Sequence, residues 1–232
     1  VGQTLLKRLM EDEKCTASMD AMQSVLPSYT RFGMSALLPH RKLSMSDDYN
    51  VLVDGKVCDN LNSREQVLQS FVPSSRTVQF DDIKTMKVAE LKEIFSGQEV
   101  VYVYHNQIDA RGDKLNTENE VFTACEEAVE EIHIMIKRLT SANNIRFIIT
   151  ADHGFIYKRD KLVESDKISG FDRENAFVGR RYVIASEGIH AEGVGTLRLG
   201  DILGNEDERI VSVPIGSDVF KVSGGGQNFV HG

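Results

Sequence analysis

The chain has 232 residues, a hydrophobic fraction of 41% and a formal net charge of -8, which suits one large globular domain. No stretch approaches the ~18 consecutive apolar residues of a membrane-spanning helix, and because charged and apolar residues alternate in the opening segment, we expect that it is not a signal peptide. An acidic chain also lacks the clustered Lys and Arg of proteins that bind phosphate backbones loosely, so any contact with nucleic acid would be local.

The chain does not begin with Met and opens directly into a predicted helix, so we expect it to be an excised fragment of a longer protein. Its three cysteines, Cys15, Cys58 and Cys125, are scattered and show no Cys-x-x-Cys spacing. That usage predicts free thiols in a reducing, cytoplasmic compartment rather than a disulfide framework.

Helices and short apolar runs alternate along the first two thirds of the chain. Helical spacing of apolar residues predicts helices at 3–13, 62–71, 86–97 and 117–142, the second of them capped by Ser63. Strands are predicted between the helices, at 21–26, 76–80, 99–105 and 145–151. Apolar runs without alternation are typical of strands covered on both faces, so this order predicts a three-layer α/β sandwich with a mostly parallel central sheet.

Two regions depart from this alternation and predict small β-rich insertions within a single domain over 1–232. Residues 43–60 resemble an inserted hairpin, with Asp54 and Gly55 as its turn. Residues 159–222 contain short apolar runs with Gly-rich connections, which indicate a β-rich appendage.

Ligands of parallel sheets gather at the carboxyl ends of the strands, and polar residues follow the predicted strands at these points. Thr30 comes after the first strand and before a short helix, where a hydroxyl is either part of a phosphate site or, more commonly, an N-cap. His105, Asp109 and Asp113 follow the third strand in a predicted Gly-containing loop, which suits either a divalent cation site or a plain polar turn.

Two further polar segments lie later in the chain. Asp152 and His153 end the fourth strand and offer oxygen and nitrogen ligands to one ion, with Gly154 permitting a sharp turn; a solvated loop explains them equally well. His231 is a lone histidine before a glycine, a pattern that is usually structural. Each segment is ambiguous alone, but their order along the chain is more specific.

The order Thr, Asp-x-x-Gly-Asp, Asp-His-Gly, His-Gly resembles that of the alkaline phosphatase superfamily. Within this superfamily, the sequence is most similar to the PglZ domain of bacterial phage-defence systems of the BREX type. The resemblance spans the whole chain and is carried by four segments: PSYTRFGMSALLPH, VYVYHNQIDARGD, TADHGFIY and FVHG.

The resemblance implies two divalent metal ions, Zn, Mn or Mg. Thr30 would be the nucleophile, Asp152 and His153 would bind one ion, and Asp109, Asp113 and His231 would bind the other. Many relatives have His where this chain has Asp113, and a carboxylate makes Mn²⁺ or Mg²⁺ as plausible as Zn²⁺. The family also places an Asp at the end of a strand upstream of this chain, so we expect the fragment to hold one ion or none and to be less active.

The implied function is a phosphatase or nuclease that hydrolyses a phosphate ester or phosphodiester, with other BREX proteins as partners. The alternative is a catalytically weak scaffold or partner-binding module of a multiprotein defence complex. A sulfatase-like activity is disfavoured, because sulfatases need Cys or Ser at the position that Thr30 occupies.

Overall fold

The computed structural model describes residues 1–222 and 227–231, which form two compact units. The first unit comprises residues 1–23 and 72–150, and the second comprises residues 24–71 and 151–232. The prediction that 1–232 form one domain stays a prediction. Across the described residues, no helix combines the length and apolar character needed to cross a lipid bilayer.

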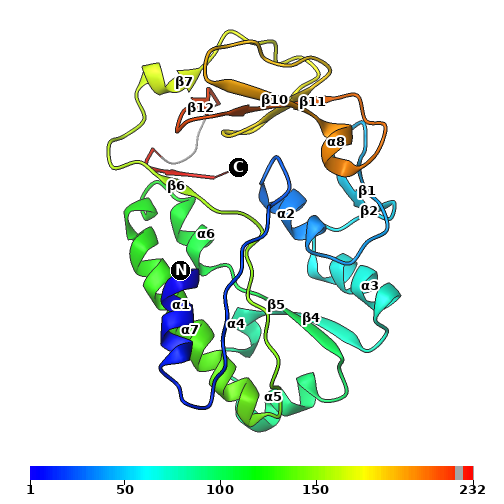
Figure 1. The fold of residues 1–232 in the computed structure, drawn as a ribbon, viewed down its shortest axis with the longest axis vertical. Helices are drawn as coiled ribbons and strands as arrows, with labels where there is room; N and C mark the ends of the chain where they lie inside the picture. Colours follow the sequence, from blue (N-terminus) through cyan, green and yellow to red (C-terminus); the bar gives the residue numbers. More distant parts are fainter. Residues whose placement is uncertain (223–226, 232) are drawn as a thin grey trace. The chain divides into compact units, whose positions relative to one another are not determined.

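The first unit contains a two-stranded parallel sheet and most of the long helices (Figure 1). Strand β4 (Ser75–Gln79) pairs with β5 (Val100–Tyr104), which confirms the strands predicted at 76–80 and 99–105. The helical elements are α1 (Gly2–Met10), α4 (Phe80–Ile83), α5 (Val88–Phe95), α6 (Gln107–Gly112), η1 (Glu118–Glu120) and α7 (Val121–Ser141).

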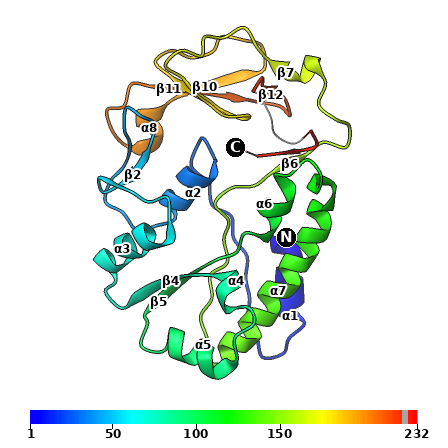
Figure 2. The ribbon, with the colours of Figure 1, turned by 180° about the vertical axis from the view of Figure 1, so that it is seen from behind.

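The core of the first unit lies between the sheet and the long helix α7. Phe80, Leu91 and Phe95 meet Met135 and Leu139 of α7 in a buried cluster. A second cluster joins α1 to α7, which lie side by side in both ribbon views (Figures 1 and 2). The apolar residues of α7, which recur at helical spacing, are therefore buried in these two clusters. This is the burial that the periodicity predicts.

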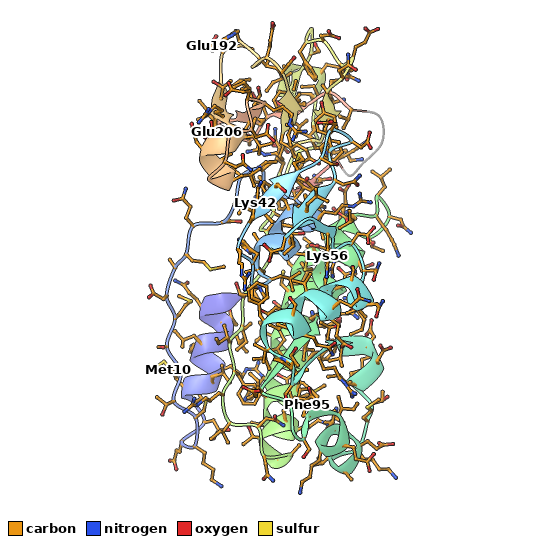
Figure 3. All side chains as sticks on the ribbon, turned by 90° about the vertical axis from the view of Figure 1, so that its right-hand side faces the viewer. Met10, Lys42, Lys56, Phe95, Glu192 and Glu206 are labelled. Atoms are coloured by element: carbon orange, nitrogen blue, oxygen red, sulfur yellow. The ribbon has the colours of Figure 1, made fainter. Side chains whose placement is uncertain are left out.

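The last residues of helices α1 and α5 differ in their exposure to solvent. Met10 is 65% exposed at the last residue of α1, whereas Phe95, the last residue of α5, is buried (Figure 3). Gly97 follows α5 with a positive φ of 75°, which any residue with a side chain adopts only at a cost. The C-cap of the helix is Ser96, whose backbone is extended, and Gly97 lies in the turn that follows.

Two predicted strands are wrong. Residues 21–26 and 145–151 have no regular secondary structure, because the described residues give neither segment a hydrogen-bonded neighbouring strand. Phe147 packs against the first unit's core, but Ile148 is 96% exposed. The chain thus has a mixed α/β fold with several small sheets, rather than a demonstrated mostly parallel central sheet.

The second unit is built from small sheets, most of them antiparallel. Residues 43–57 form a three-stranded sheet in which Asp54 and Gly55, both with positive φ, connect the last two strands. Its strands are β1 (Leu43–Met45), β2 (Val51–Val53) and β3 (Lys56–Val57). The predicted hairpin turn is thus present; whether these strands are an insertion stays a prediction.

Helix α3 (Leu61–Phe71) begins one residue earlier than predicted, and Ser63 is not its cap. The side chain of Asn60 accepts a hydrogen bond of 3.0 Å from the backbone N–H of Ser63. The Ser63 hydroxyl oxygen lies 3.3 Å from the Asn60 backbone nitrogen, which donates to it. Asn60 and Ser63 thus satisfy each other's backbone donors, in the manner of a capping box.

The region predicted as a β-rich appendage contains a four-stranded antiparallel sheet in the order β10-β11-β9-β8. Two further pairs are β12 with β7, in parallel, and β13 with β6, antiparallel. The elements are β6 (Ile156–Tyr157), η2 (Glu164–Asp166), β7 (Lys167–Ile168), β8 (Phe177–Val178), β9 (Val183–Ala185), β10 (Val194–Arg198), α8 (Leu199–Leu203), β11 (Ile210–Pro214), β12 (Val219–Phe220) and β13 (Phe229–Val230).

Candidate functional site

Thr30 is the first residue of α2 (Thr30–Ala36), and Tyr29 occupies the N-cap position with extended backbone angles. The interpretation of Thr30 as an N-cap is therefore wrong. Its hydroxyl oxygen Oγ1 lies 3.0 Å from Nε2 of His153, which is a hydrogen-bonding distance. The nucleophile predicted from the sequence and one predicted metal ligand are thus in direct contact.

Tyr29 fixes the start of α2 through a buried aromatic cluster. Its ring stacks on that of Tyr182, with centroids 4.8 Å apart, and meets Phe32 and Phe177. Burial raises the pKa of Tyr29 to about 12, so its phenol stays neutral and serves as an anchor rather than as an acid or base.

The two ring nitrogens of His153 have different hydrogen-bond partners. Its Nδ1 lies 3.1 Å from the carbonyl oxygen of Gly154. A carbonyl can only accept, so Nδ1 donates to it, and in this tautomer Nε2 presents a lone pair. Nε2 therefore accepts from the Thr30 hydroxyl and has the form in which an imidazole binds a metal.

Asp152 brings a carboxylate to the same nitrogen. Its Oδ2 lies 3.5 Å from Nε2 of His153, and the two side chains are only 14% and 3% exposed, respectively. Among the described residues, this buried Oδ2 has no hydrogen-bond partner. Leaving a buried carboxylate oxygen without a donor is costly, and a cation between the two groups would offset that cost.

His231 is placed beside this pair by the antiparallel ladder of β6 and β13. Phe229 pairs with Tyr157 and Val230 with Ile156, so the same register sets His231 opposite the residue two positions after His153. Diagonal neighbours on one face of such a ladder are within reach of each other. The His153 and His231 rings are indeed stacked, with centroids 4.6 Å apart and planes inclined by 5°.

Asn228 and Arg180 hold this ladder, and the sequence analysis missed both. The buried amide of Asn228 donates to the carbonyls of Lys158, at 2.7 Å, and Arg159, at 3.1 Å. The Arg180 guanidinium donates to the Phe229 carbonyl at 3.1 Å. An Asn three residues before His231 was the only available signal, because the partners lie 49 to 70 residues away.

Asp109 and Asp113 belong to the first unit and lie on or next to a helix rather than in the predicted Gly-containing loop. Asp109 is in the first turn of α6, and Asp113 is its C-cap, with its N–H bonded to the Asp109 carbonyl at 3.0 Å. The prediction of a loop there is wrong, because residues 107–112 form a helical turn. Residues four apart share a helix face, so both carboxylates remain suited to one ion. Their grouping with His231 stays a prediction.

His105, which precedes α6, has a different partner. Its Nε2 lies 2.7 Å from Oε2 of Glu131 on α7, and its ring packs on Phe80. This pair ties the end of β5 to α7 within the first unit, so His105 has a structural explanation.

The residues around Thr30 fit one divalent ion incompletely. In residues 1–222 and 227–231, no three His, Cys, Asp or Glu side chains are grouped so that they alone could hold a metal. Asp152 and His153 supply one carboxylate oxygen and one imidazole nitrogen, and Thr30 adds a hydroxyl at hydrogen-bonding distance. An oxygen, a nitrogen and a hydroxyl are suitable ligands for Zn²⁺ or Mn²⁺.

Comparisons with known proteins cover the whole chain. A family model described as the BREX system PglZ alkaline phosphatase-like domain matches residues 1–232. The chain is 38% identical over 235 residues to "Alkaline phosphatase-like protein PglZ" of Bacillus cereus (strain H3081.97). It is 31% identical over 237 residues to "Alkaline phosphatase-like protein BrxZ" of Escherichia coli O9:H4 (strain HS).

Both alignments cover 100% of this chain but only 27% of each relative, so the chain spans about a quarter of the length of these proteins. No solved structure matches the chain.

Proposed function

Because the chain belongs to the PglZ alkaline phosphatase-like family, we propose that it is a metal-dependent phosphoric ester hydrolase domain in which Thr30 attacks phosphorus. The observation that carries this proposal is the contact between the Thr30 hydroxyl and the His153 imidazole, beside the buried Asp152 oxygen that has no donor among the described residues. A hydroxyl nucleophile next to an imidazole and a carboxylate that can bind a cation is an arrangement suited to phosphoryl transfer.

The reaction of the chain's own residues has two steps. Thr30 Oγ1 forms a bond to phosphorus and loses its proton as the bond to the ester oxygen breaks; the leaving oxygen takes up a proton and departs as an alcohol, and the phosphoryl group stays on Thr30. Water then attacks phosphorus, one of its protons restores the Thr30 hydroxyl, and inorganic phosphate leaves from a monoester or a phosphate monoester from a diester. The hydrogen bond to His153 orients Oγ1 before attack, and the buried aromatic anchor at Tyr29 holds the helix that carries it.

Asp152 and His153 would hold one divalent ion, and Asp109, Asp113 and His231 a second. When bound, such ions stabilise the negative charge of the attacking oxygen and of the transferring group. The number of protein ligands around Thr30 is low among the residues that the structure describes. That the chain alone binds one ion or none stays a prediction.

The setting of this activity is proposed from the family. The whole protein would complete a three-layer sandwich with a mostly parallel sheet and act in bacterial phage defence, in the cytoplasm, with other BREX proteins. The substrate would be a phosphate ester or a phosphodiester, and the net charge of -8 supports only local contacts with nucleic acid.

The test compares Thr30→Ala with Thr196→Ala in the whole protein, since Thr196 is exposed on β10 of the same unit. With Mn²⁺ or Zn²⁺, hydrolysis of p-nitrophenyl phosphate or its bis ester should fall by at least about 10³-fold in Thr30→Ala. It should be unchanged in Thr196→Ala. Hydrolysis that is equal in both variants would reject Thr30 as the nucleophile.

The scaffold alternative is favoured by the absence, in the described residues, of a complete three-ligand group. It predicts that Thr30→Ala and Asp152→Asn leave phage defence intact in cells. The hydrolase proposal predicts that both variants lose defence while their protein levels match the wild type.

A further inference from the structure

Gly33 lies in the middle of α2, buried, three residues after Thr30. A glycine inside a helix costs about 1 kcal/mol relative to alanine, so its presence there calls for a reason. Its φ is not among the positive values of the chain, so backbone conformation does not require glycine. The reason must be the space that a side chain would occupy.

That space is filled by the backbone of Asp152. A Cβ on Gly33 would overlap the carbonyl oxygen of Asp152 and would lie 2.7 Å from its carbonyl carbon and 3.0 Å from its Cβ. The first two obstacles are main-chain atoms, which cannot rotate away as a flexible side chain can. Any larger residue therefore pushes α2 and Asp152 apart.

Residues three apart share one face of a helix, so Gly33 and Thr30 face the same neighbour. The close approach at Gly33 therefore sets the distance at which Thr30 Oγ1 meets His153 Nε2, now 3.0 Å. Gly154 and Gly216, in the same unit, have nothing within 4 Å of the corresponding Cβ position. The close contact with Asp152 thus distinguishes Gly33 from these two glycines.

We infer that Gly33 is a positioning residue: its missing side chain lets α2 approach Asp152 closely enough for Thr30 to share one ion with Asp152 and His153. This inference rests on the proposed function. Misplacing a reacting group by about 1 Å can cost about 10²-fold in rate, so even a small retreat of α2 would be measurable.

The test uses Gly33→Ala and the matched control Gly216→Ala in the whole protein. Three quantities are measured: the affinity for Mn²⁺ alone by titration calorimetry, kcat and KM on bis-p-nitrophenyl phosphate, and Tm of the metal-free protein. Gly33→Ala should bind Mn²⁺ at least about tenfold more weakly and lose about 10²-fold in kcat with a smaller change in KM. Gly216→Ala should match the wild type.

A second variant covers the case in which Gly33→Ala does not fold. Phe32 is fully buried beside Gly33, so the double variant Phe32→Leu/Gly33→Ala gives α2 room to move back. It should fold with Mn²⁺ affinity and kcat well below those of Phe32→Leu alone, which is its reference because Phe32 belongs to the aromatic cluster that anchors α2. Wild-type affinity and kcat in Gly33→Ala would overturn the inference. So would unfolding of both the single and the double variant that carry Gly33→Ala, since the contact would then serve folding as a whole.

A wild-type protein that neither binds Mn²⁺ nor hydrolyses the ester would refute the proposed function instead. The positioning role is then decided by crystal structures of the metal-free variants. It requires the Thr30 hydroxyl to leave hydrogen-bonding distance of His153 in Gly33→Ala but not in Gly216→Ala, and an unchanged separation would refute it.

Discussion

The hydroxyl oxygen of Thr30 lies 3.0 Å from Nε2 of His153, a residue 123 positions later in the chain. The contact joins the start of α2 to the segment before β6, within one compact unit. Asp152 and His231 each touch the same imidazole, the first through a buried oxygen and the second by ring stacking. Four residues that the sequence places in three separate segments are therefore gathered at one imidazole ring.

Asp152→Asn should separate stability from function. Removing the charge from a buried oxygen that has no donor among the described residues should raise the stability of the metal-free protein by about 1 kcal/mol. The rise in Tm on adding Mn²⁺, expected for the wild type, should disappear. Differential scanning calorimetry with and without Mn²⁺ measures both effects. The exposed Asp160→Asn should change neither, and a destabilised Asp152→Asn that still responds to Mn²⁺ would contradict the assignment.

His231→Phe tests whether the stacked imidazole binds metal or only packs. Phenylalanine keeps a planar ring against His153 and Phe229 but removes both nitrogens. Tm of the metal-free protein should stay close to the wild type, while affinity for Mn²⁺ should fall at least about tenfold. The exposed His190→Phe is the control. Unchanged Mn²⁺ affinity in His231→Phe would assign His231 a purely structural role.

Asp109→Asn and Asp113→Asn test the second ion. If both carboxylates belong to a two-metal site, each substitution should reduce the Mn²⁺ bound by the whole protein from two ions to one. Metal analysis after gel filtration measures the stoichiometry, with the exposed Asp82→Asn as control. If the number of bound Mn²⁺ ions did not change, Asp109 and Asp113 would not be metal ligands.

Asp207 provides a pH-dependent prediction on the second unit's stability. Its hydrogen bond with Arg209, at 2.9 Å, lowers the pKa of the Asp207 carboxyl below its usual value. Arg209 in turn donates to the carbonyls of Met45 and Ser46, both at 2.8 Å. The ionised carboxylate thus stabilises the folded state above the unfolded pKa of about 3.9, and this contribution is lost as pH falls through the lower folded pKa.

Asp207→Asn should therefore destabilise the protein by about 1 kcal/mol at pH 7, and the difference from wild type should shrink as pH falls below about 4. Urea unfolding at several pH values measures it. Glu208→Gln, which removes a largely exposed partner of Arg198, should have little effect at any pH. A difference for Asp207→Asn that is constant with pH would contradict the role of the carboxylate charge.

Local pattern predicted much of the secondary structure but not the sheet. The apolar stripe of α7 and the strands β4 and β5 follow from local apolar spacing, although the partners that bury them, such as α1 for α7, lie far away in sequence. Residues 145–151 have the composition of a buried strand, yet a strand also needs a hydrogen-bonded neighbour, which the described residues do not supply. Composition cannot show whether that neighbour is present.

The structure groups four of the predicted site residues, Thr30, Asp152, His153 and His231, but their roles stay predictions and their geometry could not be foreseen. The order of Thr30, Asp152 and His231 was informative through its resemblance to a family. The close approach of Gly33 to Asp152 could not be foreseen, because no sequence pattern indicates which distant residue packs against a glycine in a short helix. The same holds for Asn228, whose two carbonyl partners lie far back in the chain.

The most direct test of the central claim is to quench the reaction of the whole protein with a phosphate ester in acid and to analyse its peptides by mass spectrometry. We expect phosphate on the peptide that contains Thr30, dependent on a divalent ion and absent in Asp152→Asn. Steady hydrolysis with phosphate on no residue, or on one other than Thr30, would contradict the account.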